Sequence, residues 1–449
     1  MSRPLQPTRT VPFWKALALG VCAMAIGPNL ALSAAYQLHY SGLHSWLAFL
    51  GAAVLAMLVA VALSRFAGRF EVTATILSYV KLTAPRSITA LVAASLLLGY
   101  LVGPADGVLA EAIYLTSLLL PLSPHAAEPW AQCLTVAVAA LFIGACAYRG
   151  VDVSAWIATA LGIACIPVAI WLTVASASSF HFDVRPELTT GGLSLDSTLR
   201  GIFIAMAFFI GFDGVASLAS ETAEPRRNVP RLLISLLVIA GVTLSIGTLL
   251  QAPALWVRSA ALDAGQSPTQ VMAVAGGFPR LALAADIVLA LAGLASLIGW
   301  LNISALVVAA ASQDGFLPPA LGRTHARYGS PCNAVLLLTA LSVILPMAMI
   351  AWTRSAPITS TIYFTNVMVL LWLIPYGVVC GCALKRLYPG ERLRAPVMAA
   401  AIGLIAVALV VGAMLLRPAS QTSALVNVIA AAVVVIAATL FYNQTPERL

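Results

Sequence analysis

Long apolar stretches, separated by short polar segments, run along nearly the whole chain. A helix that crosses a lipid bilayer needs about 20 consecutive, mainly apolar residues. Twelve stretches of about this length recur, at residues 15–37, 43–64, 88–119, 130–148, 153–178, 198–220, 229–254, 279–311, 333–352, 356–384, 395–416 and 421–442. The pattern therefore predicts an all-α membrane protein with 12 transmembrane helices.

The composition leaves little room for a soluble fold. Of the 449 residues, 61% are hydrophobic and only 9% are charged, whereas soluble domains carry about 25% charged residues. The net charge is +8, but the basic residues form short clusters between apolar stretches and no basic face with interleaved aromatic rings. We therefore expect the lipid bilayer as partner and no nucleic acid.

The basic clusters also predict how the chain lies in the membrane. Most of the 24 Lys and Arg residues fall in segments on the same side as the amino terminus. Cytoplasmic segments of membrane proteins carry an excess of these residues. We expect cytoplasmic tails at 1–14 and 443–449, one transmembrane domain at 15–442, and a location in the bacterial inner (plasma) membrane.

Two of the predicted helices contain sequences that interrupt regular hydrogen bonding. In the first helix Gly27 precedes Pro28, and proline removes a backbone donor and disfavours the helical conformation of the residue before it. In the sixth helix two glycines lie beside Asp213. Ile-Gly occurs at both breaks, at 26–27 and 210–211, five helices apart. This spacing is what two structural repeats of five helices would produce.

Broken helices at the centre of a membrane are typical of transporter substrate sites. Backbone N–H groups freed by a break suit a carboxylate, and freed carbonyls suit an ammonium group, so an amino acid would use both. A kinked helix that merely packs closely is the alternative for either break alone. The residues predicted to bind substrate at the breaks are Ala25, Ile26, Gly27, Phe208, Ile210, Gly211 and Asp213.

Carboxylates inside transmembrane helices are costly and are often functional. Asp213 lies at a break and Asp106 follows Gly103-Pro104, a further kink, so both are expected to face the substrate. Glu111 and Asp286 are expected nearer the outer water interface. Because no Lys or Arg lies inside a predicted span, Asp106 and Asp213 weakly favour a cationic substrate as their counter-charge.

Segments in or next to the fifth, sixth, eighth and tenth predicted helices resemble motifs of a known transporter family. The chain resembles the amino acid–polyamine–organocation superfamily in Ile210-Gly211-Phe212-Asp213, in the acidic-basic segment 221–230 and in Gln313-Asp314-Gly315-Phe316-Leu317-Pro318. Within the superfamily it is most similar to the basic amino acid and polyamine antiporters, such as the arginine–agmatine antiporter, in Ile166-Pro167-Val168, Gly299-Trp300 and Leu373-Ile374-Pro375-Tyr376.

The resemblance implies a fold and site roles. The implied fold is LeuT-like, with two inverted five-helix repeats at about 15–178 and 198–384 and two extra helices at about 395–442. The implied roles are proton sensing for Asp213, an aromatic wall of the substrate path for Trp300 and a substrate contact from the tenth helix for Asn366. The chain departs from the family pattern at Cys22, Pro104 and Ala207.

These observations predict a secondary active transporter of amino acids or related amines that works by alternating access as an antiporter or with protons. Its partners are the small-molecule substrate, protons and a second copy of the chain as a homodimer. A neutral amino acid permease and a sensor that binds without transporting are the alternatives. An enzyme is not expected, because no catalytic motif occurs. No cofactor or metal is expected, because no cysteine or histidine spacing fits a metal site.

Overall fold

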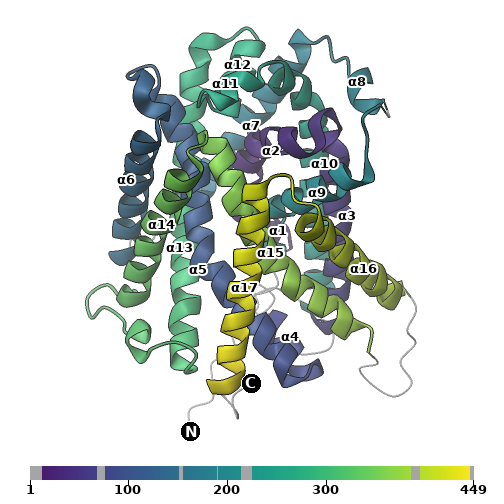
Figure 1. The fold of residues 1–449 in the computed structure, drawn as a ribbon, viewed down its shortest axis with the longest axis vertical. Helices are drawn as coiled ribbons and strands as arrows, with labels where there is room; N and C mark the ends of the chain where they lie inside the picture. The colour runs from purple at the N-terminus through teal and green to yellow at the C-terminus, as the bar shows by residue number, and fades with distance from the viewer. Residues whose placement is uncertain are drawn as a thin grey trace.

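The computed structural model describes residues 13–67, 76–150, 155–189, 191–213, 225–385 and 395–444. Every regular element within these ranges is a helix, as the apolar pattern predicts. Figure 1 shows most of the long helices lying side by side along the longest axis of the molecule. Each helix satisfies its own backbone hydrogen bonds, so a bundle of this kind can lie within the hydrocarbon of a bilayer.

The long helices agree with the predicted stretches to within about four residues, which is normal for helix ends. They are α3 (Ser45–Ala67), α5 (Arg86–Leu119), α6 (Pro129–Tyr148), α7 (Ala155–Ser179), α10 (Pro225–Val257), α13 (Pro279–Gln313), α14 (Cys332–Thr353), α15 (Pro357–Ala383), α16 (Ala395–Leu416) and α17 (Gln421–Gln444). The predicted first and sixth helices are interrupted, and their described parts are α1 (Phe13–Ala23), α2 (Ile26–Ser41) and α9 (Leu195–Ala205).

Short helices that the apolar pattern does not predict connect the long ones. They are α4 (Ile76–Thr83), α8 (Arg185–Leu188), α11 (Ser259–Asp263) and α12 (Pro268–Ala275). Capping explains where two helices begin, because Ser194 accepts a hydrogen bond from the N–H of Ser197 in α9, and Ser267 accepts one from the N–H of Gln270 in α12. Figure 1 places α8, α11 and α12 at the end of the molecule opposite α4.

Ten stretches of the described chain are long and apolar enough to cross a membrane. The first, Ile26–Phe66, contains α2 and all of α3 except its last residue. The predicted span at 198–220 does not qualify within the described residues, because α9 already ends at Ala205. The count of twelve spans and the inverted repeats stay predictions.

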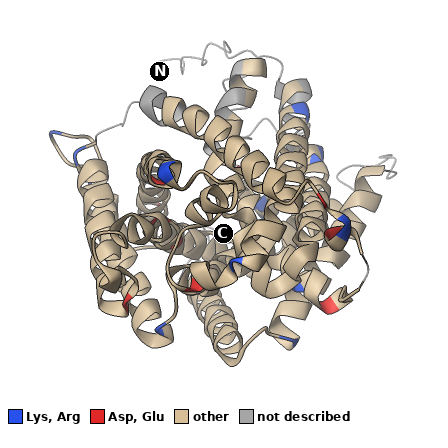
Figure 2. Cartoon of the chain, turned by 90° about the horizontal axis from the view of Figure 1, so that it is seen from above, with Lys and Arg blue, Asp and Glu red and all other residues tan. Residues whose placement is uncertain are grey.

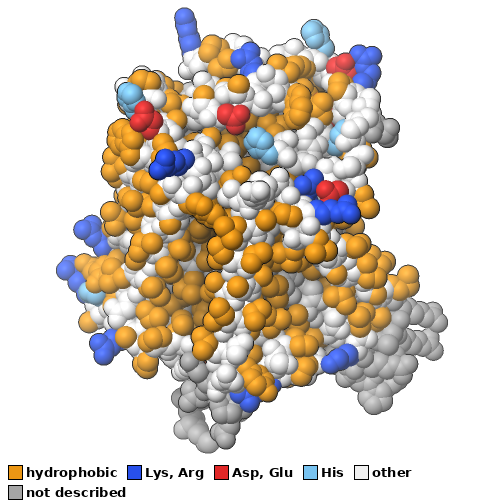
Figure 3. All heavy atoms as spheres, viewed as in Figure 1, with side chains coloured by type: hydrophobic (Ala, Val, Ile, Leu, Met, Phe, Trp, Pro, Cys, Tyr) orange, Lys and Arg blue, Asp and Glu red, His pale blue; other side chains and the backbone are white. Residues whose placement is uncertain are grey.

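The surface is that of a protein surrounded by lipid. Figure 3 shows a broad apolar band, with charged side chains and histidines mainly towards the two ends of the long axis. On α6, Leu134, Val138 and Leu141 are all more than half exposed. Seen from above, in Figure 2, charged residues are sparse among the helices. Water would not tolerate so large an apolar surface, whereas hydrocarbon chains match it.

Small residues allow neighbouring helices to approach closely in a membrane. Gly144 of α6 is buried against α14, and a Cβ built on it would lie 2.2 Å from Oγ1 and 2.9 Å from Cβ of Thr339. In contrast, a Cβ built on Gly412 of α16 meets nothing within 4 Å. These two glycines therefore differ in what they do for packing, although both lie within long helices.

We expect Gly144→Ala to lower the thermal stability of the protein, because the added methyl group overlaps with Thr339. Overpacking of this kind typically costs about 1–3 kcal/mol. Gly412→Ala is the matched control and should leave stability unchanged or raise it, since alanine favours a helix by about 0.5–1 kcal/mol over glycine. Thermal unfolding of both variants in one detergent makes the comparison. Equal melting temperatures would contradict the packing argument.

Candidate functional site

The first break lies two residues before the glycine that marks it in the sequence. Met24 and Ala25 separate α1 from α2, and Ala25 has φ 48° and ψ 43°, the left-handed region that alanine rarely adopts. Gly27 and Pro28 are helical, so of the residues predicted at this break, Ala25, Ile26 and Gly27, only Ala25 lies in the interruption itself. Proline is tolerated in the first turn of a helix, because its missing N–H would have no acceptor within the helix there.

Gly27 packs against α7. A Cβ built on it would lie 2.4 Å from Sγ of Cys165 and 3.2 Å from the backbone nitrogen of Ile166. The neighbouring Ile26 is 4% exposed. The absence of a side chain at Gly27 therefore lets α2 and α7 approach closely. Contact of Ile26 and Gly27 with a substrate stays a prediction.

The second break lies within the segment where it was predicted. After α9 ends at Ala205, a 3₁₀ turn, η3 (Met206–Phe208), and irregular backbone lead to Asp213. Gly211 has φ +96°, which glycine adopts readily and other residues do not. Residues 214–224, which include the rest of the predicted sixth helix and its acidic segment, lie outside the described residues.

The side chain of Asn29 joins the two breaks. Its Nδ2 donates a hydrogen bond of 2.8 Å to the carbonyl oxygen of Met24 and one of 3.4 Å to the carbonyl oxygen of Phe208. Both acceptors lie where a helix stops, and such carbonyls have no donor within the helix. Asn29 supplies the missing donor for each. Sequence reasoning did not single out Asn29, although an asparagine in an apolar helix, directly after a proline, is a signal that could have identified it.

Two further polar contacts hold α2 along α9. Nε2 of Gln37 donates to the carbonyl oxygen of Gly201 at 3.0 Å, and Oγ of Ser41 donates to that of Ser197 at 3.4 Å. As residue numbers rise along α2, those of the partners on α9 fall. The helices are therefore antiparallel, with both breaks at the same end.

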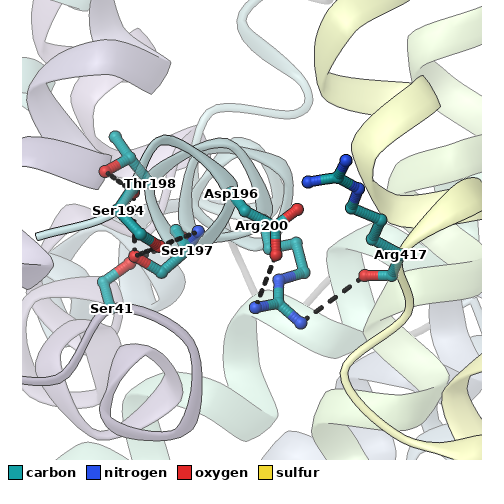
Figure 4. A network of polar contacts seen from close by, with 7 residues as sticks. All are labelled: Ser41, Ser194, Asp196, Ser197, Thr198, Arg200 and Arg417. Carbon is teal, nitrogen blue, oxygen red and sulfur yellow. Dashed lines mark hydrogen bonds and ion pairs between the residues drawn. The ribbon is translucent and has the colours of Figure 1, made fainter.

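The end of α9 that lies away from the break is also anchored. Figure 4 shows Arg200 between Asp196, on the preceding turn of α9, and Arg417, at the end of α16. The guanidinium lies 2.9 Å from the Asp196 carboxylate and donates to the carbonyl oxygen of Arg417 at 3.5 Å. Together with Ser41 on the opposite side, this fixes the direction in which α9 enters the break.

Aromatic rings surround the second break. A Cβ built on Gly211 would lie 3.8 Å from the ring of Trp300, and Trp300 itself fits over Gly103 of α5. Trp300 stacks on Tyr100 with ring centroids 6.1 Å apart, and Tyr100 meets the edge of Trp372 at 5.4 Å. The structure therefore brings Trp300 to Gly211, as a wall of the substrate path would require.

The two acidic site residues have hydroxyl partners on α15. Tyr376 donates from its hydroxyl to Oδ1 of Asp213 at 2.9 Å, and Thr365 donates from Oγ1 to Oδ1 of Asp106 at 2.7 Å. Both carboxylates are partly buried. Hydrogen bonds of this kind reduce the cost of holding a carboxylate away from water. The roles of Asp106 and Asp213 in binding and proton sensing stay predictions.

Asn366 lies apart from the breaks. Its Nδ2 donates to the hydroxyl of Tyr40 at 3.3 Å and to Oγ of Ser423 at 3.4 Å, which links α15 to α2 and α17. Phe208 lies at the second break. Its ring packs edge to face with the rings of Tyr36 and Phe49, with centroids 5.2 Å apart in each pair. Ile210 is partly buried in the turn beside it.

Two carboxylates are placed differently from the sequence expectation. Glu111 of α5 is 3% exposed and Asp286 of α13 is fully buried, so neither side chain is open to solvent. The sequence position near a helix end suggested exposure, but α12 packs over α13 at this end of the molecule. An apolar groove of about 470 Å³ between α15 and α16 contains neither acid and none of the predicted site residues.

Two helices that break side by side in an all-helical apolar chain are characteristic of membrane transporters with discontinuous helices. A family model described as "Amino acid permease" matches residues 12–439 of the chain. The chain belongs to this family. It is thus an integral, multi-pass membrane protein of a transporter family, and not of an enzyme family.

Two curated relatives are similar over part of the chain. The "Branched-chain amino acid permease BcaP" of Lactococcus lactis subsp. cremoris (strain MG1363) is 26% identical over 196 residues, which are 42% of this chain and 41% of the relative. The protein of the same name from Bacillus subtilis (strain 168) is 25% identical over 179 residues, 40% of this chain and 37% of the relative. The chain spans about two fifths of the length of each. The resemblance to arginine–agmatine antiporters stays a prediction.

We expect Asn29→Ala to destabilise the region of the two breaks, because the carbonyls of Met24 and Phe208 would lose their shared donor. Loss of a partner for a buried polar group typically costs about 1–3 kcal/mol. Asn333→Ala is a control, since Asn333, in the first turn of α14, donates to one carbonyl only, that of the exposed Ala320. Hydrogen exchange of the segments that contain the breaks measures the effect. Protection that is unchanged in Asn29→Ala would show that the bridge is not needed.

Proposed function

We propose that this protein carries neutral, apolar amino acids across the membrane by alternating access between its two sides. The observation that supports this most is the Asn29 bridge, which holds two helix breaks together beside an aromatic wall. A polar end formed by backbone and an apolar end formed by rings match the two parts of such a substrate.

The α-carboxylate is proposed to bind at the start of α2. The first N–H groups of a helix have no acceptor within it, and the helix dipole adds partial positive charge there. Ile26 and Gly27 supply these groups after Ala25. The ammonium group would donate hydrogen bonds to free carbonyl oxygens in the turn that follows α9. These lie beside the Phe208 carbonyl, which already accepts a hydrogen bond from Asn29.

The side chain is proposed to face the aromatic rings. Trp300 and Tyr100 stack beside Gly211, and their faces offer contact area to a branched aliphatic chain. Asp106 and Asp213 motivated the expectation of a cationic substrate, but each already accepts a hydroxyl hydrogen bond. These contacts hold the two acids to α15 whether or not the substrate carries a charge. The names of the two relatives, branched-chain amino acid permeases, support the same choice.

Uptake into liposomes that contain the purified protein tests the substrate class. We expect labelled leucine to accumulate, and we expect isoleucine and valine to compete with it while arginine, lysine and putrescine do not. A branched aliphatic side chain buries its apolar surface against the aromatic wall, whereas a cationic chain would lose its hydration there, which is the physical reason for this order. Empty liposomes are the control. Competition by the cationic compounds but not by the aliphatic ones would reverse the proposal in favour of a basic amino acid or polyamine transporter.

We expect Gly211→Val to abolish leucine uptake while the protein stays folded and monodisperse. The φ of +96° strains any β-branched residue, and the added side chain points towards the Trp300 ring. Gly299→Val is the matched control, because Gly299 is exposed on the helix that carries Trp300 and a Cβ there meets nothing within 4 Å. Uptake rates and gel filtration of both variants make the comparison. Normal uptake by Gly211→Val would place the substrate elsewhere.

A further inference from the structure

A second polar cluster lies between α5 and α13 and beside α12. It contains Glu111, Tyr114 and Asp286, which are 3%, 2% and 0% exposed. All three lie within stretches that are able to cross a membrane. Buried carboxylates in such positions are costly and are often functional, and the proposed amino acid site uses neither Glu111 nor Asp286.

Asp286 is oriented by two hydroxyl groups. Its Oδ1 accepts hydrogen bonds from Oγ of Ser267, at 2.6 Å, and from Oγ1 of Thr269. Ser117 of α5 holds Ser267 in turn, because the Ser117 hydroxyl accepts a hydrogen bond of 2.9 Å from the backbone N–H of Ser267. These contacts fix one oxygen of the carboxylate. The other, Oδ2, is buried and has no hydrogen-bond partner among the described residues.

Glu111 and Tyr114 present two more oxygens without partners. The Glu111 side chain is pressed against α13, since a Cβ built on Gly293 would lie 2.1 Å from its Oε2. Its Oε1 and the hydroxyl of Tyr114 are buried and have no partner in the described part of the chain. Tyr114 lies one turn along α5 from Glu111, and Ser117, on the next turn, is joined through Ser267 to Asp286.

No cationic side chain balances this cluster within the described ranges. Ion pairs between described residues join other acids, as Asp183 with Arg185, Asp196 with Arg200 and Glu128 with His125. Besides Glu111 and Asp286, the titratable groups near Tyr114 are Tyr36 of α2 and Cys165 of α7, and neither is cationic. The charged residues nearest in sequence on α11 and α13, Asp263 and Arg280, are exposed.

We propose that Glu111, Tyr114 and Asp286 form a binding site for a small monovalent cation, a sodium ion or a proton, which neutralises the two buried carboxylates. Donor sets made only of oxygen suit hard cations. Two like charges that share a buried space cannot both persist without a positive charge between them. Tyr114 adds the oxygen of an uncharged hydroxyl group, so the site is more than a pair of carboxylates.

Thermal unfolding of the full-length purified protein tests the site without any transport. Sodium chloride is compared with potassium chloride and N-methyl-D-glucamine chloride at equal ionic strength, and pH is then varied in N-methyl-D-glucamine chloride. If sodium is the ligand, the melting temperature of the natural protein rises with sodium chloride and saturates, as mass action requires. If a proton is the ligand, sodium has no specific effect, and the melting temperature falls as pH rises because both carboxylates lose their neutralising charge.

Variants connect either effect to the cluster. We expect Glu111→Gln and Asp286→Asn to lose most of the sodium effect or of the pH effect, whichever the natural protein shows. Asp263→Asn, which removes an exposed carboxylate of α11, should keep it. Gly293→Ala provides an independent variant that retains both acids, since the added methyl group displaces Glu111 from α13. The proposal is overturned if the natural protein shows neither effect, or if the effect persists undiminished in Asp286→Asn and Gly293→Ala.

Discussion

Backbone polar groups that no helix satisfies cannot be left bare inside a membrane, and this constraint organises the protein. Both helix breaks release carbonyl groups, and Asn29 supplies the donor for one carbonyl at each. Because the same amide serves both, the breaks are tied together in space. Gln37 and Ser41 extend the tie along α2 to α9, so the two helices approach the breaks as one antiparallel pair.

The same constraint explains how the chain treats its intramembrane acids. Asp106 and Asp213 each accept a hydroxyl hydrogen bond from α15, a helix that is almost wholly buried. One helix therefore steadies both acids next to the breaks, and a movement of α15 would change the surroundings of both. Glu111 and Asp286 are held differently. Hydroxyl groups donate to Oδ1 of Asp286, whereas Oδ2 of Asp286 and Oε1 of Glu111 have no hydrogen-bond partner among the described residues. This difference is why we assign the two pairs to different ligands.

Several predictions from sequence depended only on local chemistry, and these agree with the structure. The positions of the long helices follow from the length of apolar sequence that a bilayer requires, and nearly every end is recovered. The second break follows from Gly211, whose positive φ suits no other residue. The first break falls at Met24 and Ala25, at the start of the stretch Ala25–Gly27 where it was predicted, and Pro28 lies in the first turn of the helix that follows.

What the sequence determined by itself is therefore the class of the protein: an apolar, all-helical chain with two interrupted helices, whose family follows from the same residues. Tertiary structure alone decided which polar groups meet. The contacts of Asn29 with Phe208, of Asp213 with Tyr376 and of Asp106 with Thr365 join residues 179, 163 and 259 positions apart. Hydrophobic periodicity records which face of a helix avoids water, but it does not record which neighbour that face meets. For the same reason, the burial of Glu111 and Asp286 followed from the packing of α12 and α13, and their place in the sequence gave no sign of it.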